Sequence, residues 1–362
     1  MLDPPTFMIL HLLHCSMEAA RLHAYTHEMD EALSFDTVDA PQPTHPTHVV
    51  VRVAGAGWCQ TDNHIIEGMW DPYVDQPLPM TLGHENAGEV VATGDAVTTV
   101  TEGDQVICHP QATCGVCRPC RQGEDMYCEA SFFPGLDTDG GFAEQLLTNE
   151  RAVIPLPDGV DPVDIAPHAD AGITAYHAAK KVARAVDPGD HVLVVGVGGL
   201  GHIGLQALAA MTATHITAID VKAEARALAR ELGADATVDP TGEDVVAAVD
   251  AITDGGAAQL VDFVGSDVTT GYASDLLRAG GDHHVVGYGG HIHVPAQDLI
   301  SNEVAYRGTL VGRYTELQEL MALVAMDAVT LRSERFGFDA INDVAARLEA
   351  GKIEGRAVIT PP

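Results

Sequence analysis

The sequence predicts an α/β protein of two domains, one irregular and mostly β, the other built on a doubly wound parallel sheet. Its 362 residues exceed one ordinary core and suit two domains of usual size. Hydrophobic residues make up 46% of the chain, so both domains can bury a core. Near Ala169 the pattern changes from short alternating runs to helical and continuous apolar runs, which separates the two domains.

The first domain is expected over residues 17–170, where short β-like runs alternate with turns rich in Gly, Pro and Asp. Helices expected at 317–325 and 340–350 and a strand at 356–359 return to it, so residues 312–362 complete this domain. Residues 1–16 precede a further methionine, Met17, and are expected to be a disordered extension or a misassigned start. The clearest strand patterns lie at 49–53, 87–92, 105–108 and 142–148.

The second domain is expected over residues 171–311 and begins with a helical period that runs to Lys181. The continuous apolar run at 191–195 suits a strand that is buried on both faces of a sheet. Helices and strands then alternate, which implies parallel strands joined by helices. The helices are expected at 200–211, 223–232, 245–252 and 272–277, and the strands at 216–219, 236–238, 259–263, 284–286 and 307–311.

The chain is strongly acidic, with 52 acidic and 19 basic residues and a formal charge of −33. Such a charge repels phosphate backbones and anionic lipid surfaces, which excludes nucleic acid and membrane partners. It would also strain the compact state unless salt screened it, so we expect adaptation to high salt. An ordinary acidic cytosolic enzyme is the alternative. No apolar run approaches the ~20 residues of a spanning helix, and we expect a cytoplasmic protein.

Four of the seven cysteines form a cluster, Cys114-x-x-Cys117-x-x-Cys120 followed by Cys128. Thiolates at this spacing can surround one tetrahedral Zn²⁺ and leave no open position, which indicates a structural zinc site. Reduced cysteines in a loop are the alternative. Either interpretation places the chain in a reducing compartment.

A second metal site is indicated by Cys59 and by His84, which stands in Gly83-His-Glu-x-x-Gly88. A catalytic zinc has three protein ligands and one exchangeable position, and a thiolate and an imidazole supply two of these ligands. Each residue alone is more often a buried apolar side chain or a satisfied core histidine. The glycines around His84 and the polar cluster Gln60-Thr-Asp-Asn-His64 favour the metal site.

A glycine motif, Gly196-x-Gly198-Gly199-x-Gly201, lies between the apolar strand and the next helix. Such glycines allow a tight turn and a close approach of a pyrophosphate to the helix N-terminus. Asp220 follows about 20 residues later at the end of the next strand, the position that binds an adenosine ribose. The motif predicts a dinucleotide-binding Rossmann domain rather than a packing turn.

From Met17 to Pro362 the sequence resembles the zinc-containing medium-chain alcohol dehydrogenases, and most closely the archaeal and actinobacterial secondary-alcohol enzymes. The resemblance implies a GroES-like catalytic domain beside the Rossmann cofactor domain. It also implies two zinc ions per chain, NAD as cofactor, and a homodimer or homotetramer. The segments that carry it are Gly83-His-Glu-Asn-Ala-Gly88, Arg121 to Cys128, Phe133-Pro-Gly-Leu136 with Gly140-Gly-Phe-Ala143, and Ala169-Asp-Ala-Gly-Ile-Thr-Ala-Tyr176.

The resemblance also assigns roles around the expected catalytic zinc. Asp170 becomes the third ligand, where many relatives have cysteine, although its position also suits a helix N-cap. Glu85 becomes an alternate ligand, and Asp62 orients His84 by accepting its second N–H. Thr61 and His64 match a relay that passes the alcohol proton through the cofactor ribose to water, and a solvated surface histidine is the alternative for His64.

Cofactor contacts are implied at the four motif glycines, at Asp220 and Thr174, and at Arg356, which resembles an arginine that faces the pyrophosphate. Gln60 replaces a residue that is basic in several relatives. Asp220 disfavours the 2′-phosphate of NADP, and Lys222 is the only nearby cation in the sequence. The substrate is expected to be a small alcohol, aldehyde or ketone. A polyol or sugar dehydrogenase and a nucleotide-binding protein without turnover are the alternatives. Trp58, Trp70 and Phe132 are guesses for the substrate pocket.

Overall fold

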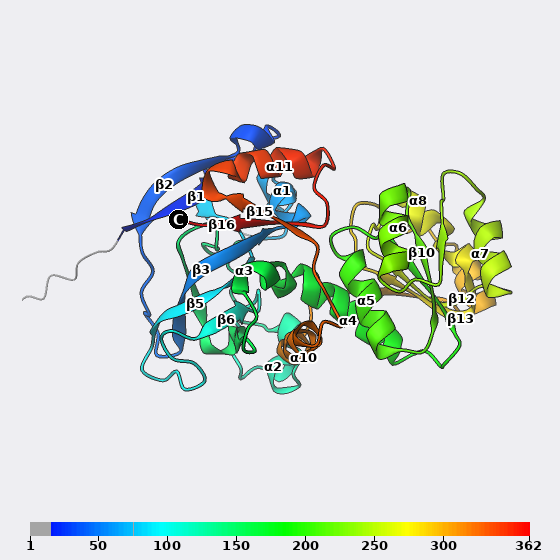
Figure 1. Cartoon of the computed structure of the whole chain (residues 1–362), viewed down its shortest axis with the longest axis horizontal. Coiled ribbons are helices and arrows are strands. Elements are labelled where there is room, and N and C mark those ends of the chain that lie inside the picture. Colours follow the sequence, from blue (N-terminus) through cyan, green and yellow to red (C-terminus); the bar gives the residue numbers. More distant parts are fainter. Residues whose placement is uncertain (1–15, 75) are drawn as a thin grey trace, which may run out of the picture.

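The computed structural model describes residues 16–74 and 76–362 and has two lobes (Figure 1). The beginning and the end of the described chain, blue and red in Figure 1, lie in the same lobe. The expected extension at 1–16 lies outside the described residues except for Ser16, which begins the first strand. Among the described residues no helix is both long and apolar enough to cross a bilayer.

The first lobe contains a seven-stranded sheet and a smaller sheet of three strands. The large sheet follows the order β15-β16-β3-β5-β6-β8, and β7 also pairs with β3. Its strands are β3 (His48–Trp58), β5 (Glu85–Thr93), β6 (Gln105–Cys108), β7 (Gln145–Asn149), β8 (Val153–Pro155), β15 (Ser333–Gly337) and β16 (Arg356–Thr360); the small sheet contains β1 (Ser16–Leu22), β2 (Leu33–Asp39) and β4 (Met80–Thr81).

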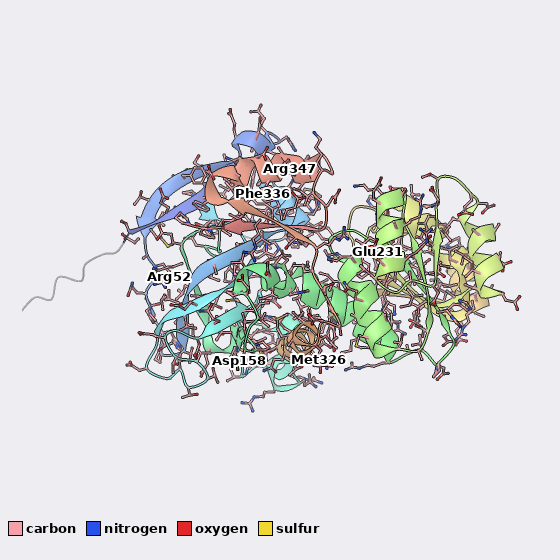
Figure 2. The ribbon with its side chains drawn as sticks, in the orientation of Figure 1. Arg52, Asp158, Glu231, Met326, Phe336 and Arg347 are labelled. Atoms are coloured by element: carbon pink, nitrogen blue, oxygen red, sulfur yellow. The ribbon has the colours of Figure 1, made fainter. Side chains whose placement is uncertain are left out.

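The end of the chain completes this first lobe. Strand β16 pairs antiparallel with β3, where Ala357 lies opposite Trp58, and parallel with β15. Helix α11 (Ile341–Glu349) lies beside these strands (Figure 1). The guanidinium carbon of Arg347 lies 4.9 Å from the ring centroid of Phe336 in β15, and both side chains are labelled in Figure 2. This stacking fastens α11 to the sheet.

The second lobe contains a six-stranded parallel sheet in the order β11-β10-β9-β12-β13-β14. This is the strand order of a dinucleotide-binding fold, with the reversal between β9 and β12, and it confirms the predicted fold class. The strands are β9 (His191–Val195), β10 (His215–Ile219), β11 (Ala236–Val238), β12 (Ala257–Asp262), β13 (Leu277–Val285) and β14 (Ala305–Gly308); the helices between them are α5 (Gly201–Met211), α6 (Ala223–Glu231), α7 (Val245–Thr253), α8 (Asp267–Tyr272) and α9 (Ala296–Asn302).

Strand β9 explains why the sequence at 191–195 has no polar alternation. Val192 and Val194 belong to one hydrophobic core, while Leu193 and Val195 belong to another. The two sets point to opposite faces because side chains alternate along a strand. Both faces are therefore covered, as expected for the central strand of a parallel sheet.

Two predicted elements of this lobe are placed differently. The helix predicted at 272–277 lies earlier in the chain, because α8 ends at Tyr272 and a 3₁₀ turn at Ala273–Leu276 follows it. Leu277 already belongs to β13 because it pairs with Ala257. The last strand, predicted at 307–311, ends at Gly308, and Val311 has a positive φ of 44° that is incompatible with a strand.

Candidate active site

Four side chains with metal-binding atoms meet where the ends of two strands of the first lobe approach the start of the helix α4 (Ala171–Ala183). Cys59 follows β3, His84 and Glu85 stand at the start of β5, and Asp170 directly precedes α4. One sulfur, nitrogen or oxygen atom from each residue lies within 4.8 Å of the others. The fold thus brings together four candidate metal ligands that are distant in the sequence.

Asp62 ties two of these segments together through its buried carboxylate. Its Oδ2 accepts a hydrogen bond of 2.8 Å from the backbone N–H of Cys59. Its Oδ1 lies 3.3 Å from Nδ1 of His84. This contact supports the orienting role predicted for Asp62, because a carboxylate behind an imidazole fixes the orientation of the ring and its tautomer.

His84 is buried, and neither ring nitrogen has a hydrogen-bond partner. A satisfied core histidine would have such partners. The Nε2 atom lies 3.5 Å from Oδ2 of Asp170. Burial lowers the pKa of His84, but Asp62 and Asp170 outweigh it and raise the pKa well above its usual value. An imidazole that faces two carboxylates without good hydrogen bonds fits a bound cation.

Asp170 occupies the N-cap position of α4, as the alternative interpretation required. Its side chain, however, accepts no capping hydrogen bond from the helix. The carboxylate faces His84 instead, so the geometry favours a ligand over a cap. Zinc is compatible with the set because one thiolate, one imidazole and one carboxylate leave a fourth tetrahedral position for an exchangeable group.

Both carboxylate oxygens of Glu85 have partners outside the other candidate ligands. Its Oε1 accepts a 3.0 Å hydrogen bond from the backbone N–H of Ala171, and its Oε2 forms an ion pair with Arg356. Burial raises the pKa of Glu85, although Arg356 opposes this. The side chain of Arg356, expected at the pyrophosphate, also lies against Gly199. It therefore bridges the metal site and the glycine loop.

The four clustered cysteines surround a second metal position in the loop that contains α2 (Arg118–Arg121). Sγ of Cys114 lies 4.0 Å from that of Cys120, and Sγ of Cys117 lies 4.0 Å from that of Cys128. These distances exceed the ~2.05 Å of a disulfide. They approach the ~3.8 Å separation of thiolates around a tetrahedral zinc with bonds of ~2.3 Å. The residues fit a structural zinc.

The two relay residues lie on α1 (Gln60–Ile66), and a third residue joins them. The hydroxyl of Tyr288, from the loop after β13, lies 2.7 Å from Oγ1 of Thr61 and 3.2 Å from Nδ1 of His64. Burial lowers the pKa of His64, while Glu67 and Glu349 oppose this shift. The sequence analysis missed Tyr288, because only the fold brings this loop to α1.

The glycine loop has the shape that a dinucleotide requires. Gly196 has a φ of 81°, and a Cβ on Gly201 would lie 1.8 Å from the carbonyl oxygen of Gly196. The turn therefore tolerates only glycine at these two positions. A Cβ on Gly198 would meet no atom within 4 Å. That open side, next to the N-terminus of α5, can accept phosphate oxygens.

Asp220 stands at the end of β10 and supports this loop. Its Oδ2 accepts a 2.8 Å hydrogen bond from the backbone N–H of Val197, and its Oδ1 accepts one of 2.8 Å from that of Lys222. The sequence suggested Lys222 as the only nearby cation, but a second one, Arg226, also lies beside Asp220. Arg226, one turn into α6, donates a 2.7 Å hydrogen bond to the backbone carbonyl of Asp220 and pairs with Asp239.

Three further residues were predicted to contact the cofactor or the substrate, and the structure places each of them differently. Thr174 is in the first turn of α4, where its backbone N–H bonds to the carbonyl of Asp170. Trp58 is in the core, stacked on Phe142. Trp70 lies at the site, with its ring centroid 6.0 Å from that of Tyr288.

Phe132, one of the guesses for the substrate pocket, packs against other parts of this lobe. It pairs with Ala112 in an isolated β-bridge, and its ring lies against His48. The ring of Phe133 contacts His84, with 6.1 Å between centroids. Neighbouring residues in extended backbone point in opposite directions, so the choice between them needs the local register.

Comparison with known proteins agrees with this geometry. Residues 45–158 match the alcohol dehydrogenase GroES-like domain, and residues 199–326 match the zinc-binding dehydrogenase family. An alcohol dehydrogenase of Moraxella sp. (strain TAE123) is 35% identical over 338 residues, 93% of this chain and 98% of the relative. A D-arabinose 1-dehydrogenase (NADP(+)) of Saccharolobus solfataricus is 32% identical, covering 92% and 96%. Other relatives are named NAD-dependent alcohol dehydrogenases.

Among solved structures, the alcohol dehydrogenase of the hyperthermophilic archaeon Aeropyrum pernix superimposes with a TM-score of 0.90. It is 47% identical and covers 95% of this chain and 100% of its own. The two family models match parts of both lobes, and the match at residues 45–158 includes Cys59, His84, Glu85 and the four clustered cysteines. The chain therefore belongs to the alcohol dehydrogenase family of zinc-binding oxidoreductases.

Proposed function

We propose that this chain catalyses reversible hydride transfer between a primary or secondary alcohol, or the matching aldehyde or ketone, and NAD. The observation that carries the proposal is the buried set of Cys59, His84 and Asp170 beside the relay residue Thr61. A zinc ion held by this set would supply Lewis acidity and make a substrate hydroxyl more acidic. Thr61 is placed to accept the hydroxyl proton, and His64 to release it to water.

The second zinc is proposed for the four-cysteine cluster, which has no free position for a substrate. That metal would hold the loop around α2 together and contribute to folding. Glu85 would remain an alternate ligand, because its ion pair with Arg356 must break before its carboxylate can move to the metal. Each chain would thus bind one catalytic and one structural zinc ion.

NAD is proposed as the preferred cofactor because of Asp220. Its carboxylate can accept hydrogen bonds from the adenosine ribose hydroxyls, whereas the 2′-phosphate of NADP would be repelled. Arg226 and Lys222 lie close enough to reduce this repulsion, so the preference is expected to be moderate. In the Asp220→Gly variant the ratio of kcat/KM for NAD over NADP should fall about tenfold or more. A wild-type enzyme that prefers NADP at every salt concentration would contradict this assignment.

A sugar or polyol dehydrogenase is the second candidate, and the name of the D-arabinose relative supports it. The two candidates differ in the substrate, since the proposed metal site and cofactor are the same. A panel of primary, secondary and cyclic alcohols, aldehydes, ketones and sugars, assayed with NAD and NADP, separates them. No turnover of any alcohol in zinc-loaded protein would refute the proposed function.

The assays belong in roughly molar KCl. A net charge of −33 leaves the acidic surface strongly self-repelling, and the screening length shrinks from about 10 Å at 0.1 M salt to about 3 Å at 1 M. We therefore propose a salt-adapted, cytoplasmic enzyme whose stability and activity rise with salt. Full stability and activity in dilute buffer would contradict the salt adaptation.

We further propose a catalytic domain of residues 17–170 and 312–362, a cofactor domain of residues 171–311, and a homodimer or homotetramer. Strand β14 is at the edge of its sheet, and the exposed apolar side chains Ile300 and Leu310 flank it. An open edge of this kind favours pairing with another chain. Light scattering coupled to size exclusion in molar KCl would determine the oligomeric state.

A further inference from the structure

A pocket on the second lobe gathers basic side chains in a chain that has few of them. The pocket is open, has a volume of about 390 Å³, and lies where the end of α4 meets β13 and β14. Lys181 and Arg184 line it from the end of α4, and Arg307 lines it from β14. The whole chain has 19 basic residues against 52 acidic ones. Three cations at one place therefore depart from the general charge of the protein, and they favour an anion there.

The parallel sheet adds two further groups to the lining of this pocket. His284 in β13 lies opposite Arg307 in β14, and Asp282 stands two residues before His284. Because side chains alternate along a strand, these three side chains point to the same face of the sheet. The ring of His283 packs against Tyr306, and both belong to the opposite face. The pocket is thus built on one face of two paired strands and on the end of a helix, which are rigid elements.

The chain itself leaves two of these cations without a carboxylate partner. Nζ of Lys181 donates to neutral oxygens, the carbonyl of Gly308 at 3.2 Å and Oγ1 of Thr309 at 3.5 Å. Lys180, one residue earlier, instead forms ion pairs with two glutamates. Within the part of the chain that the structure describes, the side chain of Arg184 forms no ion pair and no hydrogen bond. Both groups therefore remain free to hold an anion.

One carboxylate of the lining faces the third cation. Nε of Arg307 donates a 2.9 Å hydrogen bond to Oδ2 of Asp282, and the two side chains form an ion pair. Asp282 thus neutralises one of the three cations, and the lining keeps an excess of two positive charges. Burial lowers the pKa of Lys181, and Arg307 adds to this shift, although Glu316 opposes it. An anion beside the ammonium would reverse the shift, because it stabilises the charged form.

His284 provides a second sign of a missing partner. Its Nε2 lies 2.8 Å from Oε1 of Gln259, an oxygen that can only accept, so Nε2 carries the ring proton. The Nδ1 atom is buried and has no hydrogen-bond partner among the described residues. Burial lowers the pKa of His284 to about 4, so the ring adds no charge at neutral pH. Buried polar atoms are nearly always satisfied, and an unsatisfied one in the lining of a pocket points to a polar ligand.

We propose that this pocket binds a phosphate group, either as inorganic phosphate or as the phosphate of a small organic ester. A phosphate near its dianionic form balances the two excess positive charges of the lining. Its oxygens accept hydrogen bonds from guanidinium groups and from an ammonium group. A volume of about 390 Å³ far exceeds the ~30 Å³ of one water and leaves room for an organic group beside the phosphate. The site is distinct from the glycine loop, since α4, β13 and β14 supply its lining.

The test measures phosphate binding to the zinc-loaded full chain by isothermal titration calorimetry in molar KCl at about pH 7.5. NADH is present at saturation, so that the glycine loop is already occupied. Inorganic phosphate and glycerol phosphate are titrated separately, and at least one of them should bind once per chain, because partly buried charges are screened less by salt than exposed ones. Binding of one probe alone identifies the source of the phosphate group. No saturable binding of either probe would overturn the proposal.

Two variants locate the bound phosphate. Arg184→Gln disturbs no contact of the free protein, and Lys181→Gln keeps a donor for the carbonyl of Gly308. Each variant should weaken phosphate binding about tenfold, the size of one hydrogen bond to a charged group. Lys352→Gln is the matched control, because it removes the same charge from an exposed position in the first lobe and should bind phosphate as the wild type does. Unchanged binding in both pocket variants, or an equal loss in the control, would overturn the proposal.

Ligand charge and thermal stability provide two further readouts. Acetate should bind at least about tenfold more weakly than phosphate, because its single charge balances only half of the excess. Equal binding of acetate would contradict the assignment to a phosphate group. Without phosphate, Arg184→Gln should unfold at the same temperature as the wild type, and added phosphate should raise Tm in the wild type alone. An equal rise of Tm in both proteins would place the bound phosphate outside the pocket and overturn the proposal.

Discussion

The two groups of candidate metal ligands in this protein differ in how the chain brings them together. The cysteine cluster comes from one short loop, with all four ligands between Cys114 and Cys128, three of them partly exposed. The other cluster takes its ligands from three separate segments and is mostly buried. A local cluster needs only its loop to close, whereas the dispersed cluster exists only when the whole lobe is folded.

Their surroundings differ as well. In the local cluster the backbone N–H groups of Val116 and Cys117 stabilise the Cys114 thiolate and lower the pKa of Cys114 to about 6. The dispersed cluster is embedded among charged side chains, with Asp62 behind His84 and Arg356 beside Glu85. The first arrangement needs only a metal to be complete. In the dispersed cluster, buried charged side chains surround the proposed reaction site, as expected for a catalytic site.

The largest expected effect is on the dispersed cluster. Cys59→Ser should lower kcat about 1,000-fold or more, since loss of a zinc ligand removes several kcal/mol of charge stabilisation. The protein should remain folded, because serine at the N-cap of α1 can still accept from the helix. Kinetics, circular dichroism and zinc analysis would measure this, with zinc falling from two ions per chain to one.

Cys108 provides the matched control for this variant. It is a buried thiol that belongs to neither cluster, and burial raises its pKa to about 12. Cys108→Ala should keep two zinc ions and near-normal activity. Equal losses in the two variants would mean that any buried cysteine is needed for packing, and the catalytic role of Cys59 would be lost.

Disruption of the local cluster should act on stability first. Cys117→Ser is expected to lower the free energy of unfolding by about 4 kcal/mol, a size typical of a lost structural metal. Activity should fall only as the protein unfolds, so kcat per folded molecule stays near that of wild type. Denaturant unfolding in molar KCl, with zinc analysis, is the measurement. A stable Cys117→Ser protein without turnover would reverse the roles assigned to the two clusters.

The support behind His84 should matter less than a ligand itself. Asp62→Asn keeps the size of the side chain and removes the charge that faces Nδ1 of His84. Metal affinity or activity should decrease about 10- to 100-fold, as for other groups that orient a metal-bound imidazole. Zinc competition titrations and kcat would show it. Wild-type zinc affinity together with wild-type kcat would show that Asp62 serves only to cap α1.

The smallest effect is expected at the proton exit. His64→Gln should lower alcohol oxidation about tenfold at acid pH and less at alkaline pH, where hydroxide can take the proton directly. Burial lowers the pKa of His64, so the wild-type imidazole stays neutral and able to accept a proton further into the acid range. Imidazole in the buffer should restore part of the activity. A pH profile identical to that of wild type would exclude His64 from the path.

Sequence reasoning was strongest where a feature is local. The regular spacing of the cysteines, the glycine motif after an apolar strand and the alternation of helices and strands all lie within short windows. The fold class follows from them because parallel strands joined by helices have few arrangements. Even the residues that face His84 could be predicted, because they stand at the matching positions of the family that the sequence resembles.

Long-range contacts could not be predicted in the same way. The segment of Tyr288 has no pattern that points to α1, and its contacts with Thr61 and His64 depend on how the two lobes meet. The ion pair of Arg356 with Glu85 joins two segments of the first lobe that are 271 residues apart in the sequence. Phe132 and Phe133 are adjacent in sequence, and only the local backbone decides which ring meets His84.

The pairing of β16 with β3 has a consequence for how the protein is made. The parallel sheet of the second lobe is built from one uninterrupted stretch of chain, from β9 to β14. All of its strands therefore emerge from the ribosome before the end of the chain is made. The other lobe must keep the edge of β3 unpaired until Arg356–Thr360 has been synthesised. During translation the nascent first lobe therefore exposes an unpaired edge of β3, which can pair with other chains, when the second lobe is already able to fold. The last strand to emerge also brings Arg356, so the partner of Glu85 arrives only when synthesis of this region is complete.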